Sequence, residues 1–535
     1  MKTIKEVLEN SVEKYPKNIA FYEKVGKEYV GITYEKLYND VVNLGNALIE
    51  KGAKDKFVGI IGKNSYEWAV AYLATACGVG KVVPLDKQLT KNELDNCLKR
   101  LNIDTLFYSE EVEDKIEKDN IDAICMQTEM LDLIEDGKLI DKYYDKITID
   151  ENEPAVFLFT SGTTQDPKIV MLSNKNILYN LNNTDQFMEI KETDKLFSVL
   201  PMHHTFEATF GFLTPIYHGA SIIHVDSLKN IQKDMLLMKP TVLIGVPRIV
   251  DMFDSKITKE IEKKGKMKLI KNAKYITNIV PPLRKPIFKS IHDSFGGNLK
   301  TVLVGGAPVN PDVLKRLREY GFNVLQGYGL TECAPLVAGN QKRKYNDNAG
   351  GIALRGTDVR IFEPNEDGIG EIIVKGDNVM VGYYENEEAT NEVIIDGYFH
   401  TGDLGIIDKK GFIYIKGRSK NLIVTSNGKN IYPEELETLI EKNDSVSQVV
   451  VSSGVDNRGN DIVKAEIVLI DKLLKKINES EKFKEEITKV IKNYIKEINE
   501  NITEYKRIRQ VELKTEPFPE TSTKKVKRFN NKNTK

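Results

Sequence analysis

Short apolar runs alternate with helical patterns along most of the chain. Four such runs have the length of buried strands: Phe57–Ile61, Val156–Phe159, Val242–Gly245 and Thr301–Val304. Each run is followed by a turn signal and most are followed by a helical segment. This alternation predicts an α/β fold with layers around largely parallel sheets.

The pattern changes near Ile352. Short alternating strands between Gly and Asp turns, such as Glu371–Lys375 and Phe412–Ile415, predict a small β-rich subdomain. Beyond residue 420, strands are predicted near Gln448–Ser452 and Ile462–Leu469. A helix follows, with an apolar stripe formed by Phe483, Ile487, Val490, Ile491, Tyr494, Ile495, Ile498 and Ile502. We therefore expect an α+β tail of domain size.

Composition and charge are those of a soluble globular protein and favour no nucleic-acid-binding, disulfide-rich or transmembrane class. Apolar residues make up 41% of the chain, charged residues 29%, and the net charge is −2. A nucleic-acid partner is not indicated, because no excess of positive charge is present. Four scattered cysteines, Cys77, Cys97, Cys125 and Cys333, predict neither a disulfide framework nor a metal site. The stretch Trp68–Gly80 is too short to span a bilayer, so we expect a soluble cytoplasmic protein without a transmembrane segment.

The first candidate for chemistry lies in Phe159–Lys168, where a predicted strand runs into a loop of hydroxyls and glycine that ends in a lysine. Backbone N–H groups, hydroxyls and an ammonium group can together bind phosphate oxygens. A flexible polar connector is the alternative. A Walker A loop is excluded, because its spacing is absent and Ile169–Leu172 predicts another strand.

This segment resembles the phosphate loop of the adenylate-forming (AMP-binding) superfamily, which includes acyl-CoA synthetases, peptide-synthetase adenylation domains and firefly-type luciferases. Five further motifs follow in the family's order: Tyr328–Glu332, Tyr398–Asp403, Gly417–Lys420, Asn427–Glu435 and Pro519–Lys525. The resemblance implies a large N-terminal domain of layered α/β subdomains with a small β-rich subdomain. A small mobile α+β C-terminal domain would follow. The resemblance places an AMP- and acyl-binding domain in residues 1–419 and a lid domain, which carries the catalytic lysine, in residues 420–535.

The motifs carry groups suited to a nucleotide. Tyr328 offers a flat face for adenine, and Gly305, Gly306 and Ala307 offer a close backbone wall. The Glu332 carboxylate is a hard ligand of the kind Mg²⁺ prefers. The resemblance assigns the ribose hydroxyls to Asp403 and a cationic contact to Arg418. It also implies nucleotide contacts by Thr160, Ser161, Gly162, Thr163, Thr164, Lys168, Gly329 and Thr331.

The remaining predicted residues concern the acid and the thiol. The resemblance places His204 beside the reacting carboxylate and makes Lys525 the lysine that enters the site for adenylation. Lys420 would be the hinge of the lid, and the loop with Gly428 and Lys429 would line the thiol's channel. Lys524 stands where the family usually has glycine, which makes it a rival to Lys525. Three further departures from the family pattern are Gln165, Ile169 and Asn174.

The implied reaction converts a carboxylic acid, ATP and Mg²⁺ to an acyl-adenylate and pyrophosphate, and then coenzyme A takes the acyl group as AMP leaves. The segments Leu200–Glu207, Gly245–Arg248 and Phe295–Gly297 resemble the long-chain fatty acyl-CoA synthetases, so a fatty acid is the expected substrate.

Several alternatives remain open. They are a separate carrier protein as acceptor, a non-fatty acid as substrate, and a non-catalytic nucleotide-binding protein. A further alternative is an unrelated kinase or NTPase, which would release ADP where the adenylate-forming reaction releases AMP. Peripheral contact with a membrane surface also stays open.

Overall fold

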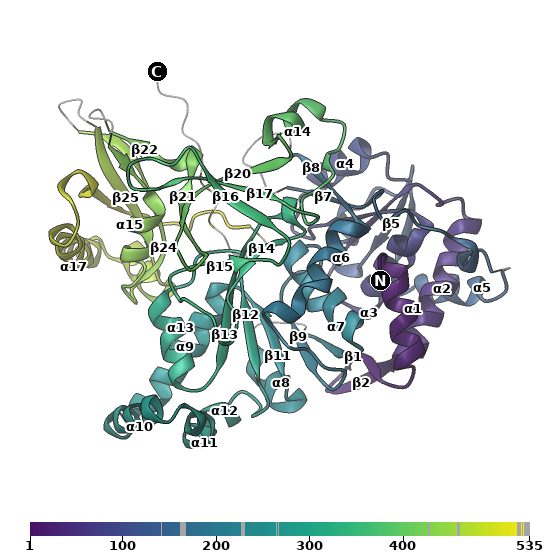
Figure 1. Ribbon diagram of the computed structural model, residues 1–535, viewed down its shortest axis with the longest axis horizontal. Coiled ribbons are helices and arrows are strands. Elements are labelled where there is room, and N and C mark those ends of the chain that lie inside the picture. The colour runs from purple at the N-terminus through teal and green to yellow at the C-terminus, as the bar shows by residue number, and fades with distance from the viewer. Residues whose placement is uncertain are drawn as a thin grey trace. The chain divides into compact units, whose positions relative to one another are not determined.

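The computed structural model describes residues 1–140, 142–160, 167–225, 230–263, 265, 267–425, 429–456, 461–521, 526 and 528 (Figure 1). The chain forms two compact units, Met1–Asp358 with Lys375–Gly397, and Val359–Val374 with Tyr398–Lys535. The second unit thus draws in two segments that precede residue 420. The domain boundary expected at that residue stays a prediction.

The first unit contains a nine-strand path in the order β15-β14-β13-β12-β11-β9-β10-β1-β2. The strands from β13 to β1 along this path pair in parallel, and β14, β15 and β2 add antiparallel pairs at the two ends. Their bounds are β1 Ile19–Val25, β2 Glu28–Thr33, β9 Lys195–Ser198, β10 Ser221–His224, β11 Val242–Gly245, β12 Thr301–Val304, β13 Asn323–Gly329, β14 Leu336–Gly339 and β15 Gly351–Ala353.

A second sheet of the same unit has the order β18-β8-β7-β4-β3-β5-β6. Its bounds are β3 Phe57–Ile61, β4 Lys81–Leu85, β5 Thr105–Tyr108, β6 Asp122–Cys125, β7 Pro154–Phe159, β8 Ile169–Ser173 and β18 Gly382–Tyr383. The strands from β7 to β6 pair in parallel, and β7, β8 and β18 pair antiparallel. The strands predicted from apolar runs in this unit are therefore confirmed.

Helices lie against both sheets, as expected for strands that are apolar on both faces. Their bounds are α1 Ile4–Lys14, α2 Tyr34–Glu50, α3 Tyr66–Ala74, α4 Lys91–Arg100, α5 Met130–Gly137, α6 Asn174–Asn182, α7 Thr214–His218, α8 Ile231–Met238, α9 Pro247–Lys263, α10 Met267–Ile279, α11 Arg284–Ile287, α12 Lys289–Asp293, α13 Pro311–Glu319 and α14 Glu387–Val393. The stretch predicted as a buried helix is α3, continued by the π-helical turn η1 Thr75–Val79. The short strand β19 is Ile394–Ile395.

The second unit holds a strand path β16-β17-β20-β21 and a three-stranded sheet β24-β25-β26. The bounds are β16 Asp358–Phe362, β17 Gly370–Lys375, β20 Tyr398–Ile407, β21 Phe412–Arg418, β22 Ile423–Val424, β23 Asn430–Ile431, β24 Val446–Val455, β25 Asp461–Leu469 and β26 Ile508–Leu513. The helices are α15 Pro433–Ile440, α16 Asp471–Glu479 and α17 Glu481–Glu500. The predicted β-rich and α+β segments are both present.

Helix α17 confirms most of the predicted apolar stripe. Ile491 and Ile495 are fully buried, and Phe483, Ile487 and Ile498 are partly buried against the same core cluster. The stripe was wrong at Val490, which is 56% exposed. At about 100° per residue Val490 falls at the edge of the stripe, so it faces solvent while Ile491 faces the core.

Within the described part of the chain, no helix is both long enough and apolar enough to cross a membrane. The four cysteines are free thiols, and all are buried.

Candidate active site

The base of the predicted phosphate loop is closed by Thr160 and Lys168. The backbone N–H of Thr160 donates to the Lys168 carbonyl oxygen at 2.9 Å, and the Thr160 hydroxyl donates to the same oxygen at 3.2 Å. The antiparallel strands β7 and β8 enter and leave this loop. Four predicted phosphate contacts, Ser161, Gly162, Thr163 and Thr164, lie outside the described residues, so their role stays a prediction.

Lys168 and Glu332 converge on Tyr383. The Tyr383 hydroxyl donates a hydrogen bond to Glu332 Oε1 at 3.1 Å. The Lys168 ammonium lies 4.5 Å from the centroid of the Tyr383 ring. A cation over a ring face is attracted by the ring quadrupole. A predicted phosphate ligand and the predicted metal ligand thus share one aromatic neighbour, for which the sequence carries no local signal.

Backbone pairing fixes the segment that carries Tyr383. Strand β18 pairs with β8, the strand that begins directly after Lys168. The backbone N–H of Met380 donates to the Glu332 carbonyl oxygen at 2.8 Å. Tyr383 is therefore tied both to the strand that follows the phosphate loop and to the turn η8 Thr331–Cys333, which holds Glu332.

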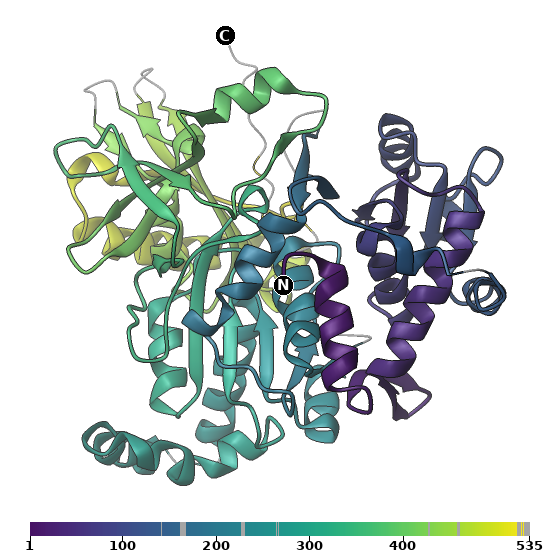
Figure 2. The same ribbon diagram turned by 45° about the vertical axis from the view of Figure 1, so that its right-hand side comes forward.

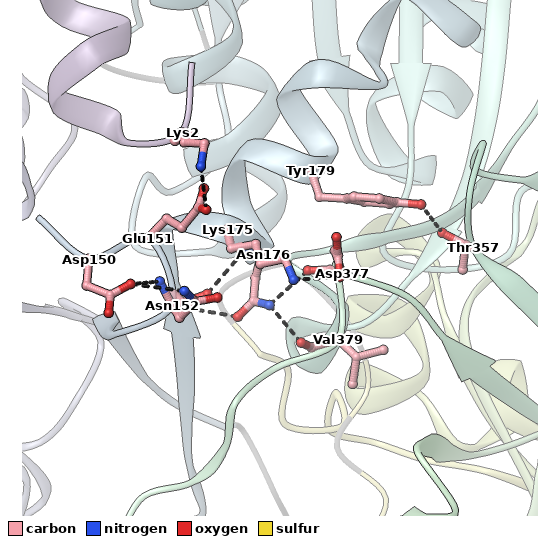
Figure 3. Close-up of polar contacts among 11 residues, drawn as sticks. Lys2, Asp150, Glu151, Asn152, Lys175, Asn176, Tyr179, Thr357, Asp377 and Val379 are labelled. Carbon is pink, nitrogen blue, oxygen red and sulfur yellow. Dashed lines mark hydrogen bonds and ion pairs between the residues drawn. The ribbon is translucent and has the colours of Figure 1, made fainter.

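Asn176 fastens the same segment from the start of α6 (Figure 3). Its Nδ2 donates to the carbonyl oxygens of Asp377 and Val379, each at 2.8 Å. Its Oδ1 accepts from the backbone N–H of Ser173, and Ser173 caps the helix in return. The Ser-x-x-Asn spacing at a helix start is a capping signal, but it does not reveal the contacts with residues 377–379.

The described residues fit a magnesium ion held largely by substrate. They contain no group of three His, Cys, Asp or Glu side chains that could hold a metal ion on their own. Magnesium in nucleotide sites commonly takes one or two carboxylates and completes its shell with phosphate oxygens and water. Glu332 could supply one such carboxylate, and the Tyr383 hydroxyl donates to its Oε1.

The predicted adenine wall follows the carboxyl ends of two neighbouring parallel strands. Strand β12 leads into Gly305, Gly306 and Ala307, and β13 ends with Tyr328 and Gly329. Tyr328 is buried. Gly306 has φ +85°, and a side chain at Gly329 would collide with the backbone of the following turn. Ligands of open α/β sheets bind at such strand ends, which is consistent with the predicted role.

His204 lies in a segment that packs on this wall. A Cβ atom added to Gly305 would lie 3.1 Å from the Phe206 ring. The backbone N–H of Phe206 donates to His204 Nδ1 at 3.4 Å. The neighbouring His203 has its Nε2 3.6 Å from Asp86 Oδ2. The structure therefore brings the histidine segment and the Gly305 segment together, as expected for a site that joins an acid to a nucleotide.

A very small apolar cavity adjoins His203. Its walls include His203, Tyr72, Leu158, Leu172, Ala208 and Leu213. The last two belong to the π-helical segment η5 Glu207–Leu213, which is buried throughout. With a volume of about 10 Å³, this cavity has room for one water molecule at most, so it is not by itself a site for an acid.

Glu207 begins η5, and its surroundings leave no signal in the sequence. Its side chain is fully buried, and neither carboxylate oxygen has a hydrogen-bond partner among the described residues. Burial raises the pKa of Glu207 to about 8. The nearby Ser198 hydroxyl and Leu200 backbone lower this pKa only in part, because neither makes a hydrogen bond of full geometry to the carboxylate. Burial therefore favours the uncharged form of this carboxyl group at neutral pH.

In the second unit, Asp403 and Arg418 form an ion pair. They face each other across β20 and β21, and Arg418 Nε lies 2.6 Å from Asp403 Oδ1. Asp403 is buried, and Arg418 also donates to the Thr401 carbonyl oxygen at 3.3 Å. The pair holds the guanidinium group of Arg418 in place against the Asp403 carboxylate. Their predicted contacts with ribose and phosphate stay predictions.

The lid residues are only partly described. Lys420 is exposed in a 3₁₀ turn at Ser419–Asn421. The backbone N–H of Lys429 donates to the Thr425 hydroxyl at 3.0 Å, which closes the base of the predicted channel loop. Gly428, Lys524 and Lys525 lie outside the described residues, so their roles stay predictions.

The residues that flank Lys525 are described and anchored. Glu520 and Val526 form an isolated antiparallel bridge, and Gln448 of β24 donates to the Glu520 carboxylate at 2.6 Å. Arg528 pairs with Glu437 and also donates to the Val451 carbonyl oxygen at 3.3 Å. Burial raises the pKa of Glu437 to about 7, although the Arg528 charge opposes the shift. Both ends of the lysine segment are therefore fixed to the sheet and helix of this unit.

Comparisons with known proteins agree with the predicted resemblance. The profile of the family described as AMP-binding enzyme matches residues 8–384, and that of the AMP-binding enzyme C-terminal domain matches residues 420–533. The chain is 28% identical over 489 residues to the long-chain-fatty-acid–CoA ligase ACSBG2 of Rattus norvegicus, covering 82% of this chain and 73% of that protein. It is 29% identical over 509 residues to long chain acyl-CoA synthetase 4 of Arabidopsis thaliana, covering 83% and 75%.

Solved structures confirm the predicted fold class. The o-succinylbenzoate CoA synthetase MenE of Bacillus subtilis, in complex with its acyl-adenylate intermediate, has a TM-score of 0.77 at 22% identity and covers 99% of this chain and 98% of its own. The anthranilate CoA ligase AuaEII, in complex with anthranoyl-AMP, has a TM-score of 0.77 at 18% identity, with coverages of 98% and 95%. At these identities the likeness establishes the fold and not the acid.

Proposed function

The chain belongs to the AMP-binding enzyme family, and we propose that it is an adenylate-forming acid–CoA ligase whose acid is a long-chain fatty acid. ATP, Mg²⁺ and coenzyme A would be its other reactants. The observation that carries the proposal is the convergence of Lys168 and Glu332 on Tyr383, since it would bring the predicted phosphate-binding cation and the predicted magnesium ligand to one site.

In the first half-reaction, a carboxylate oxygen of the acid attacks the α-phosphorus of ATP. The bond between the α-phosphorus and the bridging oxygen breaks, and pyrophosphate leaves. Lys168 would hold phosphate oxygens by charge, and Glu332 would orient the metal that neutralises the triphosphate. Lys525 would stabilise the charge that develops between the acid and the α-phosphate.

In the second half-reaction, the thiol sulfur of coenzyme A attacks the acyl carbonyl carbon. The carbon–oxygen bond to phosphate breaks, AMP leaves, and the thiol proton is released. Lys525 would obstruct the thiol if it stayed beside the acyl group. A rotation of the lid about Lys420, which lies exposed at a turn between two strands, would remove it.

Two observations support a fatty acid. The curated relatives over most of the chain include long-chain fatty acid–CoA ligases. The segments Leu200–Glu207, Gly245–Arg248 and Phe295–Gly297, which resemble the long-chain fatty acyl-CoA synthetases, point to the same acid. An aromatic acid is the second candidate, because the structural neighbours include ligases of o-succinylbenzoate and anthranilate.

Pyrophosphate release across a panel of acids tests the proposal. Palmitate, acetate, o-succinylbenzoate and anthranilate would each be offered with ATP and Mg²⁺, with coenzyme A or a holo-carrier protein as acceptor. We expect palmitate to give the highest kcat/KM and coenzyme A to be the better acceptor. A clear preference for an aromatic acid would overturn the fatty-acid assignment alone. Release of ADP in place of AMP would overturn the ligase assignment as well.

A further inference from the structure

The turn that carries Glu332 is too short to keep its own shape. It consists of the single 3₁₀ turn η8, and 3₁₀ hydrogen bonds have poorer geometry than those of an α-helix. Ala334, which ends the turn, has φ +57°, in a region that residues with a side chain rarely adopt. The position of the Glu332 carboxylate therefore depends on bonds from other parts of the chain.

The buried side chain of Asn180, in α6, bonds to both ends of the segment that follows Glu332. Its Nδ2 donates to the Cys333 carbonyl oxygen at 3.2 Å, and its Oδ1 accepts from the backbone N–H of Leu336 at 3.1 Å. Asn180 has no exposed surface. A carboxamide can donate and accept at the same time, which this pair of backbone groups requires. Residues 333–336 are therefore held against α6.

The carbonyl groups on either side of Cys333 have partners in two other segments. The Glu332 carbonyl oxygen accepts from the backbone N–H of Met380 at 2.8 Å. The Ala334 carbonyl oxygen accepts from the hydroxyl of Thr209, in η5, at 3.3 Å. Three successive carbonyl groups thus have donors on three separate segments. The turn cannot shift without breaking at least one of these bonds.

Helix α6 also holds the segment that carries Tyr383. Asn176 lies one helical turn before Asn180, so the two side chains lie on the same face of the helix. Asn176 donates to the carbonyl oxygens of Asp377 and Val379, each at 2.8 Å (Figure 3). Figures 1 and 2 both show α6 as a blue helix near the centre of the view.

A third buried asparagine joins the two held segments directly. Asn378 lies between the two residues whose carbonyl groups Asn176 binds, and its Nδ2 donates to the Leu336 carbonyl oxygen at 2.9 Å. Leu336 is also the residue whose N–H donates to Asn180. Asn378 has no exposed surface. Helix α6 and the two segments are therefore connected in a closed set of hydrogen bonds.

We propose that Asn176 and Asn180 are positioning residues of the magnesium site, with α6 as the common base that fixes the Glu332 carboxylate relative to Tyr383. Their bonds to the two segments end on backbone groups, so both asparagines act through the backbone. Groups that orient a metal ligand in this way are commonly worth tenfold or more in metal affinity. Because Glu332 is the metal ligand only in the proposed function, the inference rests on that function.

The test is calorimetric titration of the full chain with the α,β-methylene analogue of ATP, which cannot release pyrophosphate, with and without Mg²⁺. In the parent, Mg²⁺ should tighten the binding of the analogue. Asn180→Ala and Asn176→Asp should each lose about tenfold of this gain and bind the analogue as the parent does without Mg²⁺. Asn176→Asp keeps the oxygen that accepts from the Ser173 N–H, so the start of α6 stays capped.

The matched control is Asn174→Ala, the same substitution in the same helix at a residue that also has no exposed surface. Asn174 accepts from the backbone N–H of Ile4, at the start of α1, at 2.9 Å. This variant should lower the thermal midpoint, as Asn180→Ala does, but keep the gain from Mg²⁺. Thr209→Val serves if Asn180→Ala fails to fold: it keeps the shape of the side chain, removes the bond to Ala334 and should lose a smaller part of the gain.

The outcomes separate this inference from the proposed function, and the assay needs neither an acid nor coenzyme A. A parent that does not bind the analogue would overturn both. A parent that binds it equally with and without Mg²⁺ would overturn the metal assignment of Glu332 and this inference together. Undiminished gains from Mg²⁺ in the folded variants of Asn176, Asn180 and Thr209 would overturn this inference alone. An equal loss of the gain in Asn174→Ala would do the same, because it would trace the loss to general destabilisation.

Discussion

Replacement of Glu207 by glutamine tests whether the carboxyl group at the start of η5 is uncharged in the folded protein. The side chain has no exposed surface and no hydrogen-bond partner among the described residues. Burial raises the pKa of this carboxyl from 4.5 to about 8. Glutamine has nearly the same shape and carries no charge at any pH, so it reproduces the protonated form.

The sign of the effect follows from proton binding. The pKa of Glu207 is higher in the folded than in the unfolded chain, so the folded chain binds more protons between pH 4.5 and pH 8. The free energy of unfolding therefore falls as pH rises through this window. Between pH 5 and pH 7 the loss from this one group is on the order of 2 to 3 kcal/mol. Glu207→Gln should not show it.

Urea unfolding followed by tryptophan fluorescence is the assay. Trp68 is the only tryptophan and is buried, and its ring centroid lies 6.3 Å from that of Phe212, which belongs to the same π-helical segment as Glu207. We expect the parent and Glu207→Gln to unfold at similar urea concentrations at pH 5. At pH 8 the variant should be the more stable.

The control is Glu28→Gln, which changes an exposed carboxylate in the same unit. Its midpoint should follow that of the parent at every pH. Parallel curves for Glu207→Gln and the parent would refute the reasoning, because they would mean that Glu207 is ionised in the folded protein.

Three further substitutions test the active site. Glu332→Gln should abolish most pyrophosphate release at limiting Mg²⁺, because an amide is a weaker metal ligand; retention of full activity there would contradict the metal assignment. Tyr383→Phe removes the hydroxyl that holds Glu332 and should raise the Mg²⁺ concentration needed for half-maximal rate several-fold; an unchanged Mg²⁺ titration would show that the contact is dispensable. Lys525→Ala should lose adenylation yet still convert supplied acyl-adenylate and coenzyme A to thioester, whereas Lys524→Ala should do little; the reverse ranking would move the catalytic lysine by one position.

The strands and most of the site motifs could be predicted from the sequence because their signals are local. Apolar runs identified β3, β7, β11 and β12. The family motifs singled out Glu332 and Arg418, whose roles stay predictions. The ion pair of Arg418 with Asp403 was not predicted, although both residues were. It depends on the register of β20 against β21, which no single motif encodes.

The residues that position the site could not be predicted, because their partners are distant in the chain. Tyr383 meets a carboxylate 51 positions before it, and Asn176 binds carbonyl groups 201 and 203 positions after it. Such contacts follow from tertiary packing and leave no local pattern. Glu207 was assigned only to a subfamily motif, since its burial, and hence its pKa, is a property of the folded unit.

The products formed from ATP, palmitate and coenzyme A test the central claim most directly. Chromatography with mass spectrometry would identify the nucleotide and the acyl product after a single incubation with Mg²⁺. An acid–CoA ligase of a fatty acid predicts AMP, pyrophosphate and palmitoyl-CoA in equal amounts, and none of these products when palmitate is omitted. Formation of ADP, or of AMP without any palmitoyl thioester, would contradict the account.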